Sequence, residues 1–118
     1  MKKPLEILFI GMQASDALET AAQAKAAKLD QLASDIMACR VTIELADKHK
    51  HQGQTVTVRV DVTLPGRELT VGRVHDEDAY VALRDAFDAM KRQLQQAVQR
   101  ARGEVKLHAP RASAAPTS

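Results

Sequence analysis

The chain has 118 residues, which is the size of one domain and too short for two separate hydrophobic cores. Only 3% of the residues are aromatic and none is Trp, so surfaces that read single-stranded RNA by base stacking are not expected. The net charge is only +2, and any binding of a polyanion must therefore depend on local clusters of Lys and Arg.

The first third of the chain predicts a strand and a helix. Leu5–Ile10 is short, apolar and rich in β-forming residues, and Gly11 ends it, which predicts a buried strand. Ser15 or Asp16 then provides an N-cap for a helix that is expected to run to about residue 34. Its apolar positions keep helical spacing: Leu18, Ala22, Leu29, Leu32, Ala33 and Ile36.

Three segments with alternating apolar and polar residues follow, around Cys39–Leu45, Val56–Val62 and Leu69–Val71. This alternation predicts an antiparallel sheet with one buried and one solvated face. Asp47–Thr55 is expected to be a polar hairpin loop, and Leu64-Pro65-Gly66-Arg67 a tight turn.

A second helix is expected to follow the acidic run at His75–Asp78, which suits the positive end of a helix dipole. Gly103 is expected to end it. Residues 1–103 are thus expected to form one domain and residues 104–118 a flexible C-terminal tail, rich in Ala, Pro and Ser from Ala109 onward. The apolar positions of the helix are Ala79, Leu83, Ala86, Phe87, Met90 and Leu94.

The element order predicts an α+β fold with two layers, β-α-β-β-β-α. A four-stranded sheet is expected to carry two helices on one face.

The sequence favours a cytoplasmic protein. Its single cysteine, Cys39, cannot form an internal disulfide, which favours a reducing compartment, and its alternation with Val41 and Ile43 predicts a buried core residue. No secretory signal or membrane-spanning stretch is evident, so we expect no membrane partner.

An enzyme is not expected. The chain has no Gly-x-Ser-x-Gly motif and no phosphate-binding glycine loop, and we expect no cofactor and no small-molecule substrate. His49 and His51 are spaced to reach one metal ion, but a zinc site needs three or four ligands. A metal-dependent enzyme therefore stays an alternative that would require a stoichiometric metal, and we expect none.

The remaining candidate for function is distributed positive charge, because Lys and Arg on a rigid domain can hold phosphates without reading bases, as proteins that bind double-stranded RNA do. The candidate RNA-binding residues lie on the first helix, in the hairpin loop and on the second helix. They are Lys25, Lys28, Lys48, His49, Lys50, Lys91, Arg92, Arg100 and Arg102.

Several short motifs occur along the chain in a characteristic order and spacing. They are Asp78-Ala-Tyr-Val-Ala-Leu-Arg84, Met90-Lys-Arg-Gln-Leu94, Asp16-Ala-Leu18, Lys25-Ala-Ala-Lys-Leu29, His49-Lys-His-Gln-Gly53 and Leu64-Pro-Gly66. Together they resemble the ribosome hibernation-promoting factor family, also called ribosome-associated inhibitor A or ribosomal subunit interface proteins, and the resemblance covers about residues 5–102.

The resemblance implies a small protein that occupies the messenger and transfer RNA groove of the small ribosomal subunit, blocks translation and promotes ribosome hibernation. Its partners would be the small subunit and its rRNA, and a homodimer is not expected. Longer members of the family carry a second, dimerising domain, and this chain resembles the short form.

The chain departs from the family at several usually basic positions, occupied here by Glu19, Asp35, Ala89, Gln96 and Val98. Each lost phosphate contact reduces affinity, so weaker ribosome occupancy or a shifted target is expected. The alternative is a divergent interaction module of the same fold that no longer binds ribosomes. It would pair with a protein through the second helix, whose apolar stripe is Leu94, Val98, Ala101 and Val105.

Overall fold

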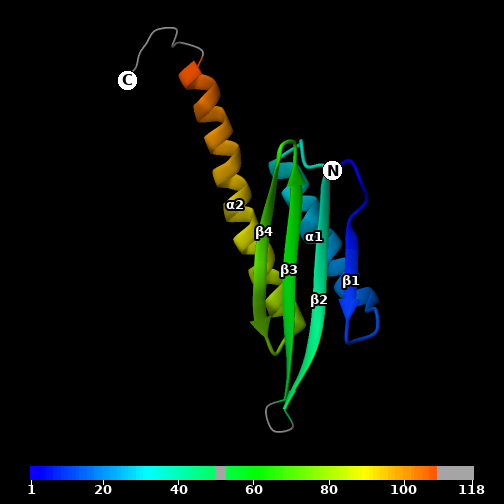
Figure 1. Ribbon diagram of the computed structural model, residues 1–118. Coiled ribbons are helices and arrows are strands. Elements are labelled where there is room, and N and C mark those ends of the chain that lie inside the picture. The colour runs from blue at the N-terminus through cyan, green and yellow to red at the C-terminus, as the bar shows by residue number, and fades with distance from the viewer. Residues whose placement is uncertain (50–52, 109–118) are drawn as a thin grey trace.

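The computed structural model describes residues 1–49 and 53–108, with side chains for residues 1–45 and 55–102. It confirms the predicted α+β fold and its element order (Figure 1). The sheet has four strands in the order β1-β2-β3-β4. The elements are β1 (Glu6–Ile10), α1 (Asp16–Leu32), β2 (Ala38–His49), β3 (Gly53–Leu64), β4 (Arg67–Asp76) and α2 (Ala79–His108).

The sheet is mixed. The three strands predicted from alternation pair antiparallel, as expected. β1 instead pairs parallel to β2, with Glu6 opposite Arg40 and Ile10 opposite Glu44. A parallel pair needs a crossover that returns the chain to the end where it started, and α1 provides it.

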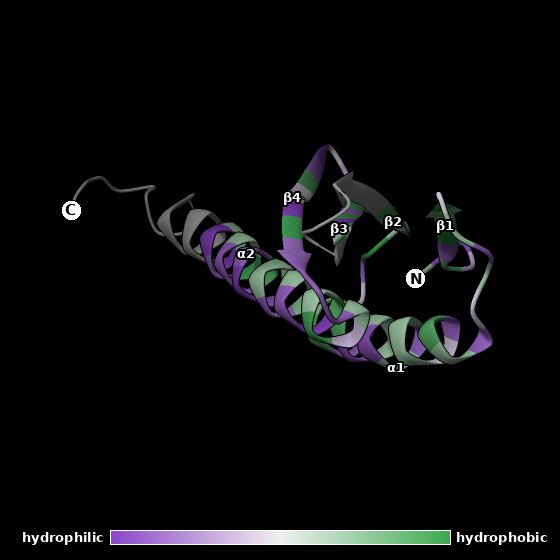
Figure 2. Ribbon diagram, turned by 90° about the horizontal axis from the view of Figure 1, so that it is seen from below, coloured by the Kyte–Doolittle hydropathy of each residue, from purple (hydrophilic) through white to green (hydrophobic). Residues whose placement is uncertain are grey.

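Both helices cover one face of the sheet and leave the other face open (Figure 2). The alternating strand residues that face the helices are buried, and Val41, Ile43, Val58 and Val60 are 0% exposed. A core residue of this size contributes about 1.5–3 kcal/mol by its burial. From the helices, the core receives Leu18, Ala22, Ala26, Leu29, Ala82, Leu83, Ala86, Phe87, Met90, Leu94 and Ala97.

The helix starts are capped by side chains. Ser15 is the N-cap of α1, and its Oγ accepts a hydrogen bond from the backbone N–H of Leu18 at 3.2 Å. Before α2, the Oδ1 of Asp78 accepts from the N–H of Tyr80 at 2.8 Å. The acidic run thus precedes α2 rather than lying within its first turn. α1 ends at Leu32, close to the expected residue 34.

Gly11 lets the chain turn away from β1. Its φ is +74°, and a Cβ at this position would lie 2.6 Å from the carbonyl oxygen of Leu45. Any other residue would therefore have to move β2 as well as adopt a strained backbone.

The prediction of a long loop at Asp47–Thr55 is wrong. β2 and β3 continue as a paired ribbon to His49 and from Gly53, with one irregularity between Asp47 and His49. Hydrogen bonds between two strands do not require apolar side chains, so the ladder continues where the alternating pattern has faded. Lys50 lies outside the described residues.

The prediction that the second helix ends at Gly103 is also wrong, because α2 continues to His108. One glycine inside a helix costs only about 1 kcal/mol relative to Ala, which the following residues can offset. The division into a domain at 1–103 and a tail at 104–118 stays a prediction, and residues 109–118 lie outside the described part of the chain.

Candidate nucleic-acid interface

A groove of about 480 Å³ is lined by residues of both helices and by none of the strands. Both helices begin at the end of the sheet where β4 ends and run side by side toward the opposite end (Figure 1). The groove is lined by Lys25, Lys28, Leu29, Gln31, Leu32, Phe87, Asp88 and Lys91. We call this the interhelical groove.

Three of the predicted cations meet at the interhelical groove. Lys25 and Lys28 come from α1 and Lys91 comes from α2. Lys25 is half-buried, whereas Lys28 and Lys91 are exposed. Asp88 is the carboxylate that lines the groove with them, so positive charge exceeds negative charge there. An anion entering the groove would find three ammonium groups at its rim and apolar side chains at its floor.

The other cations of α2 point in different directions. At roughly 100° per residue, Arg102 falls on the same side of the helix as Lys91, about three turns and roughly 16 Å further along. Arg92 lies roughly 100° around the helix from Lys91, and Arg100 lies on nearly the opposite side from Arg102. All four side chains are exposed. Of the predicted cations of α2 with described side chains, Arg102 is therefore the one that extends the Lys91 side of the helix beyond the interhelical groove.

The hairpin residues lie at a distant end of the molecule. Lys48 and His49 belong to the last residues of β2, beyond the end of the sheet where both helices begin, whereas Arg100 and Arg102 lie toward the other end (Figure 1). The side chains of Lys48 and His49, and the whole of Lys50, are outside the described part of the structure. The nine predicted residues thus do not form one continuous patch, and their role in RNA binding stays a prediction.

Two groove residues were missed by the sequence analysis. Gln31 lies three positions after Lys28, and Asp88 lies three positions before Lys91. Helix residues three apart share a side of the helix. A search for polar residues at this spacing from each lysine would have found both.

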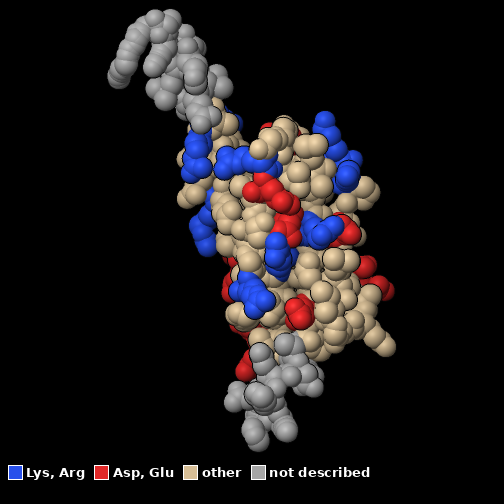
Figure 3. All heavy atoms as spheres, in the orientation of Figure 1, with Lys and Arg blue, Asp and Glu red and all other residues tan. Residues whose placement is uncertain are grey.

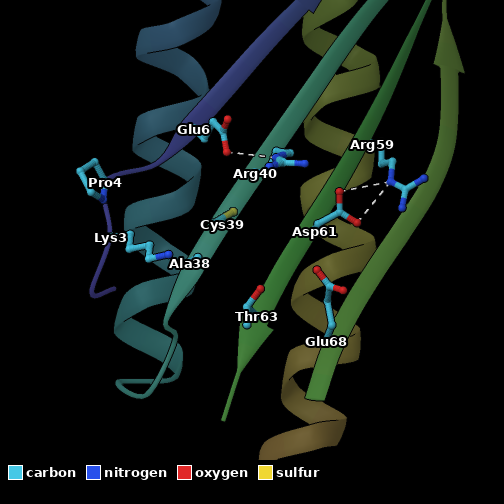
Figure 4. A pocket seen from close by; sticks show the side chains of 10 residues that line it. All are labelled: Lys3, Pro4, Glu6, Ala38, Cys39, Arg40, Arg59, Asp61, Thr63 and Glu68. Atoms are coloured by element: carbon cyan, nitrogen blue, oxygen red, sulfur yellow. Dashed lines mark hydrogen bonds and ion pairs between the residues drawn. The ribbon is translucent and has the colours of Figure 1, made fainter. Parts of the chain in front are cut away.

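The open face of the sheet also carries cations, and two of them, Arg40 and Arg59, are paired with carboxylates. In Figure 3, Lys and Arg lie beside Asp and Glu over the strands. Arg40 Nε donates to Glu6 Oε1 at 3.0 Å, and Arg59 Nε donates to Asp61 at 3.2 Å. Asp61 also accepts from Thr70 Oγ1 at 2.8 Å. Glu6, Arg40, Arg59 and Asp61 border a hollow of about 490 Å³ on this face (Figure 4). Their charges largely cancel, which makes this face a poorer surface for phosphates.

Two of the departures from the family have a packing explanation. Ala89 and Val98 are half-buried against the core, so a lysine at either position would have to leave it. Gln96 and Asp35 are exposed and Glu19 is half-buried, and no such constraint applies to them. The proposed apolar stripe of α2 also consists of residues that differ in burial. Leu94 is fully buried in the core, whereas Ala101 is exposed, and the side chain of Val105 lies outside the described residues.

Cys39 is a core residue, as predicted, and is 3% exposed. Burial, with a smaller contribution from the Asp61 carboxylate, raises the pKa of the Cys39 thiol to about 12. The thiol is therefore neutral at physiological pH and is a poor nucleophile.

The metal alternative finds no support in the described side chains, among which no group of three or more His, Cys, Asp or Glu could hold an ion. His49 and His51 have no described side chains, so the pair itself is not tested. Of the helices in the described residues, none is long and apolar enough to cross a membrane.

Comparison with known proteins links this fold to the ribosome. The family model described as Sigma 54 modulation protein / S30EA ribosomal protein matches residues 5–102. The N-terminal domain of Thermus thermophilus Protein Y is 25% identical, with a TM-score of 0.65, over 77% of this chain and 93% of that one. A ribosomal subunit interface protein from Coxiella burnetii has the same fold at 17% identity, with a TM-score of 0.68, over 80% of this chain and 97% of that one. No curated protein sequence matches the chain significantly.

Proposed function

The chain belongs to the sigma 54 modulation protein / S30EA ribosomal protein family, and we propose that it is a ribosome-binding inhibitor of translation. It occupies the messenger and transfer RNA groove of the small subunit, and by filling that groove it keeps ribosomes in an inactive, hibernating state. Its partners are the small subunit and its rRNA, and its location is the cytoplasm. The resemblance described from the motifs and the match over residues 5–102 support this assignment.

The observation that carries the proposal is the meeting of Lys25, Lys28 and Lys91 at the interhelical groove. An ammonium group binds a phosphate oxygen through charge and hydrogen bonding without reading the base. Because the three lysines come from two helices packed on one core, the spacing of their backbone positions is fixed before the RNA arrives. The groove therefore suits a folded RNA backbone of fixed shape.

Inhibition by occupancy requires no reacting group. The protein has to place a rigid body where messenger and transfer RNA would lie and hold it there through phosphate contacts. The two-layer core supplies the rigidity, and the lysines supply the contacts. Arg102, further along the same side of α2, would add a contact beyond the groove.

A double charge reversal in the interhelical groove tests the proposal. Lys28→Glu with Lys91→Glu should abolish co-sedimentation with purified small subunits at low salt, because two phosphate contacts become repulsions. The matched control is Arg40→Glu with Arg59→Glu on the open face, which makes the same change in net charge. The control should retain most of the binding.

The two results separate the site from the net charge. Equal loss in both double variants would show that binding follows total charge and not the interhelical groove. Undiminished co-sedimentation of the Lys28→Glu, Lys91→Glu variant would remove these lysines from the site. A wild-type chain that ignores ribosomes at low salt would refute the proposed function and favour the divergent interaction module.

A further inference from the structure

β1 and β4 are the two edge strands of the sheet, and they differ in how well they are protected against pairing with another chain. β4 is the better protected of the two. Gln93 of α2 donates a hydrogen bond from its Nε2 to the backbone carbonyl of Thr70 in β4, at 3.1 Å. The register between β3 and β4 also shifts near Val58 and Val60, which disturbs the ladder. β4 itself carries charged side chains at Arg67, Glu68 and Arg73. A helix contact, an irregularity and charges are the usual means by which an edge avoids pairing with another chain.

β1, at the other edge, lacks most of these features. It pairs with β2 on one side, and within residues 1–49 and 53–108 no strand or helix lies beside its outer edge in Figure 1. Its side chains on the open face are Glu6, Leu8 and Ile10. Leu8 is 39% exposed and Ile10 is 46% exposed, which makes them two of the largest exposed apolar residues among those described. An unpaired edge next to exposed apolar side chains is a template for another strand.

We propose that the outer edge of β1 pairs with β1 of a second copy of this chain, antiparallel, about a two-fold axis at Leu8. In this register Leu8 faces the partner's Leu8, and Ile10 faces the partner's Glu6. All five residues of each strand are then paired. Residues on the open face stay on the open face in both copies, because opposite positions differ by an even number of residues. The two sheets become one sheet of eight strands with all helices on the same side.

A second copy fits the charges at this edge. Glu6 is already held by Arg40 at 3.0 Å, so it can lie beside the partner's Ile10 without bringing an unpaired carboxylate to the contact. Leu8 and Ile10 of both copies form one apolar cluster across the axis, flanked by Thr42 of β2, which is opposite Leu8. A nucleic acid would instead meet Glu6 and Glu44 at this edge, so we exclude it as the occupant.

The short strand limits the strength of the dimer. Five residues a side bury less than the roughly 1,200 Å² that stable interfaces need, so the dimer is weak and depends on concentration. The inference does not rest on the proposed function, because the interhelical groove lies on the helix layer and stays uncovered in the dimer.

Cysteine cross-linking tests both the contact and its register. In the proposed register, residue 8 of one copy lies about 4.5–5.5 Å from residue 8 of the other between Cα atoms, which a disulfide spans. Purified Leu8→Cys should therefore form a disulfide dimer under mild oxidation. Ile10→Cys should not, since the two cysteines would lie four residues apart along the strands, roughly 13 Å. The wild type is the background control, because Cys39 is buried.

Sedimentation equilibrium up to millimolar concentration supplies the second readout. The wild type should show a monomer–dimer equilibrium, and Leu8→Lys with Ile10→Lys should stay monomeric and folded by circular dichroism. Tyr80→Lys, which removes an apolar side chain that is 49% exposed on α2, should dimerise like the wild type. Monomeric wild type at every concentration, or cross-linking of Ile10→Cys in place of Leu8→Cys, would overturn the proposal.

Discussion

The helix layer and the open face of the sheet both carry cations, yet they present different surfaces. On the open face, Arg40 and Arg59 are bound to carboxylates at 3.0 and 3.2 Å. At the interhelical groove, three lysines share the lining with one carboxylate, Asp88. The comparison teaches that a surface for phosphates depends on where the carboxylates lie as much as on the number of cations.

The two layers differ because strands and helices space their side chains differently. In the sheet, cross-strand partners stand directly opposite each other, so Glu6 meets Arg40 and a charge pair forms. On the helices, the lysines approach from two separate elements, each with its own spacing. Repulsion between them is tolerated because Lys28 and Lys91 remain in water.

The largest expected effect concerns stability. Ile43→Ala should lower the free energy of unfolding by about 2–5 kcal/mol, because Ile43 is fully buried on the covered face. Thr42→Ala, the next residue on the open face, should change it by no more than about 0.5 kcal/mol. Urea unfolding measures both values. Similar losses in the two variants would mean that the open face is as tightly packed as the covered one.

The second effect is a loss of stability at alkaline pH. It arises from Cys39 on the covered face and, to a smaller extent, from Asp61 on the open face. The pKa of the buried thiol is raised to about 12 from 9.0, so the unfolded thiol ionises first as pH rises. The contribution of the neutral thiol to the free energy of unfolding is therefore complete below pH 9. It is lost between pH 9 and 12, at up to about 1.4 kcal/mol per pH unit. Cys39→Ala should lack this loss when unfolding is measured across that range.

Asp61→Asn provides the control for the cause of this shift. The Asp61 carboxylate is the smaller of the two causes of the raised pKa. Its removal should therefore reduce the decrease in the free energy of unfolding at alkaline pH without abolishing it. An unchanged loss would show that burial on the covered face acts alone. A complete disappearance would reverse the order of the two causes.

A third effect rests on the proposed function and concerns salt. Lys91→Gln should reduce the slope of log affinity for small subunits against log salt by about 0.7–0.9, the value of one phosphate contact. Arg59→Gln, which removes a cation already paired on the open face, should leave the slope unchanged. Equal changes in the two slopes would remove the distinction between the faces.

The smallest expected effect is the loss of folding stability when an ion pair on the open face is removed. Both side chains of the Arg40–Glu6 pair are about half exposed, so Arg40→Gln should cost about 0.2–1 kcal/mol at low salt. The cost should shrink as salt rises, because exposed pairs are screened. Thermal unfolding at two salt concentrations checks this, and a cost above that range would show that the pair is better shielded than its exposure implies.

The sequence predicted the covered part of the fold well. Alternation identified Val41, Ile43, Val58 and Val60 as inward residues because one face of the sheet is buried. The same signal failed at Asp47–Thr55, where the two-stranded ribbon continues into polar residues. It also could not show that β1 pairs parallel, since a strand buried on one face reads the same in either direction.

The candidate site was predictable only in part. Charge identified Lys25 and Lys28 as candidates on the first helix, but their meeting with Lys91 depends on how two helices pack side by side. Arg100 and Arg102 are two positions apart and therefore lie roughly 200° apart around α2, and their role in RNA binding stays a prediction. Tertiary packing, which no local pattern records, decides which cations share a surface.

The parallel pairing of β1 also shapes how the molecule opens and closes. β2, β3 and β4 are joined by short connections, whereas Glu6 must find Arg40 across 34 positions and an intervening helix. Closing so long a segment carries an entropic cost that the hairpins avoid, so β1 is expected to join the sheet last and leave it first. Amide hydrogens of β1 should then exchange with solvent well before those of β3. β1, the strand proposed to pair with a second copy, would then also be the strand that separates most easily from its own sheet.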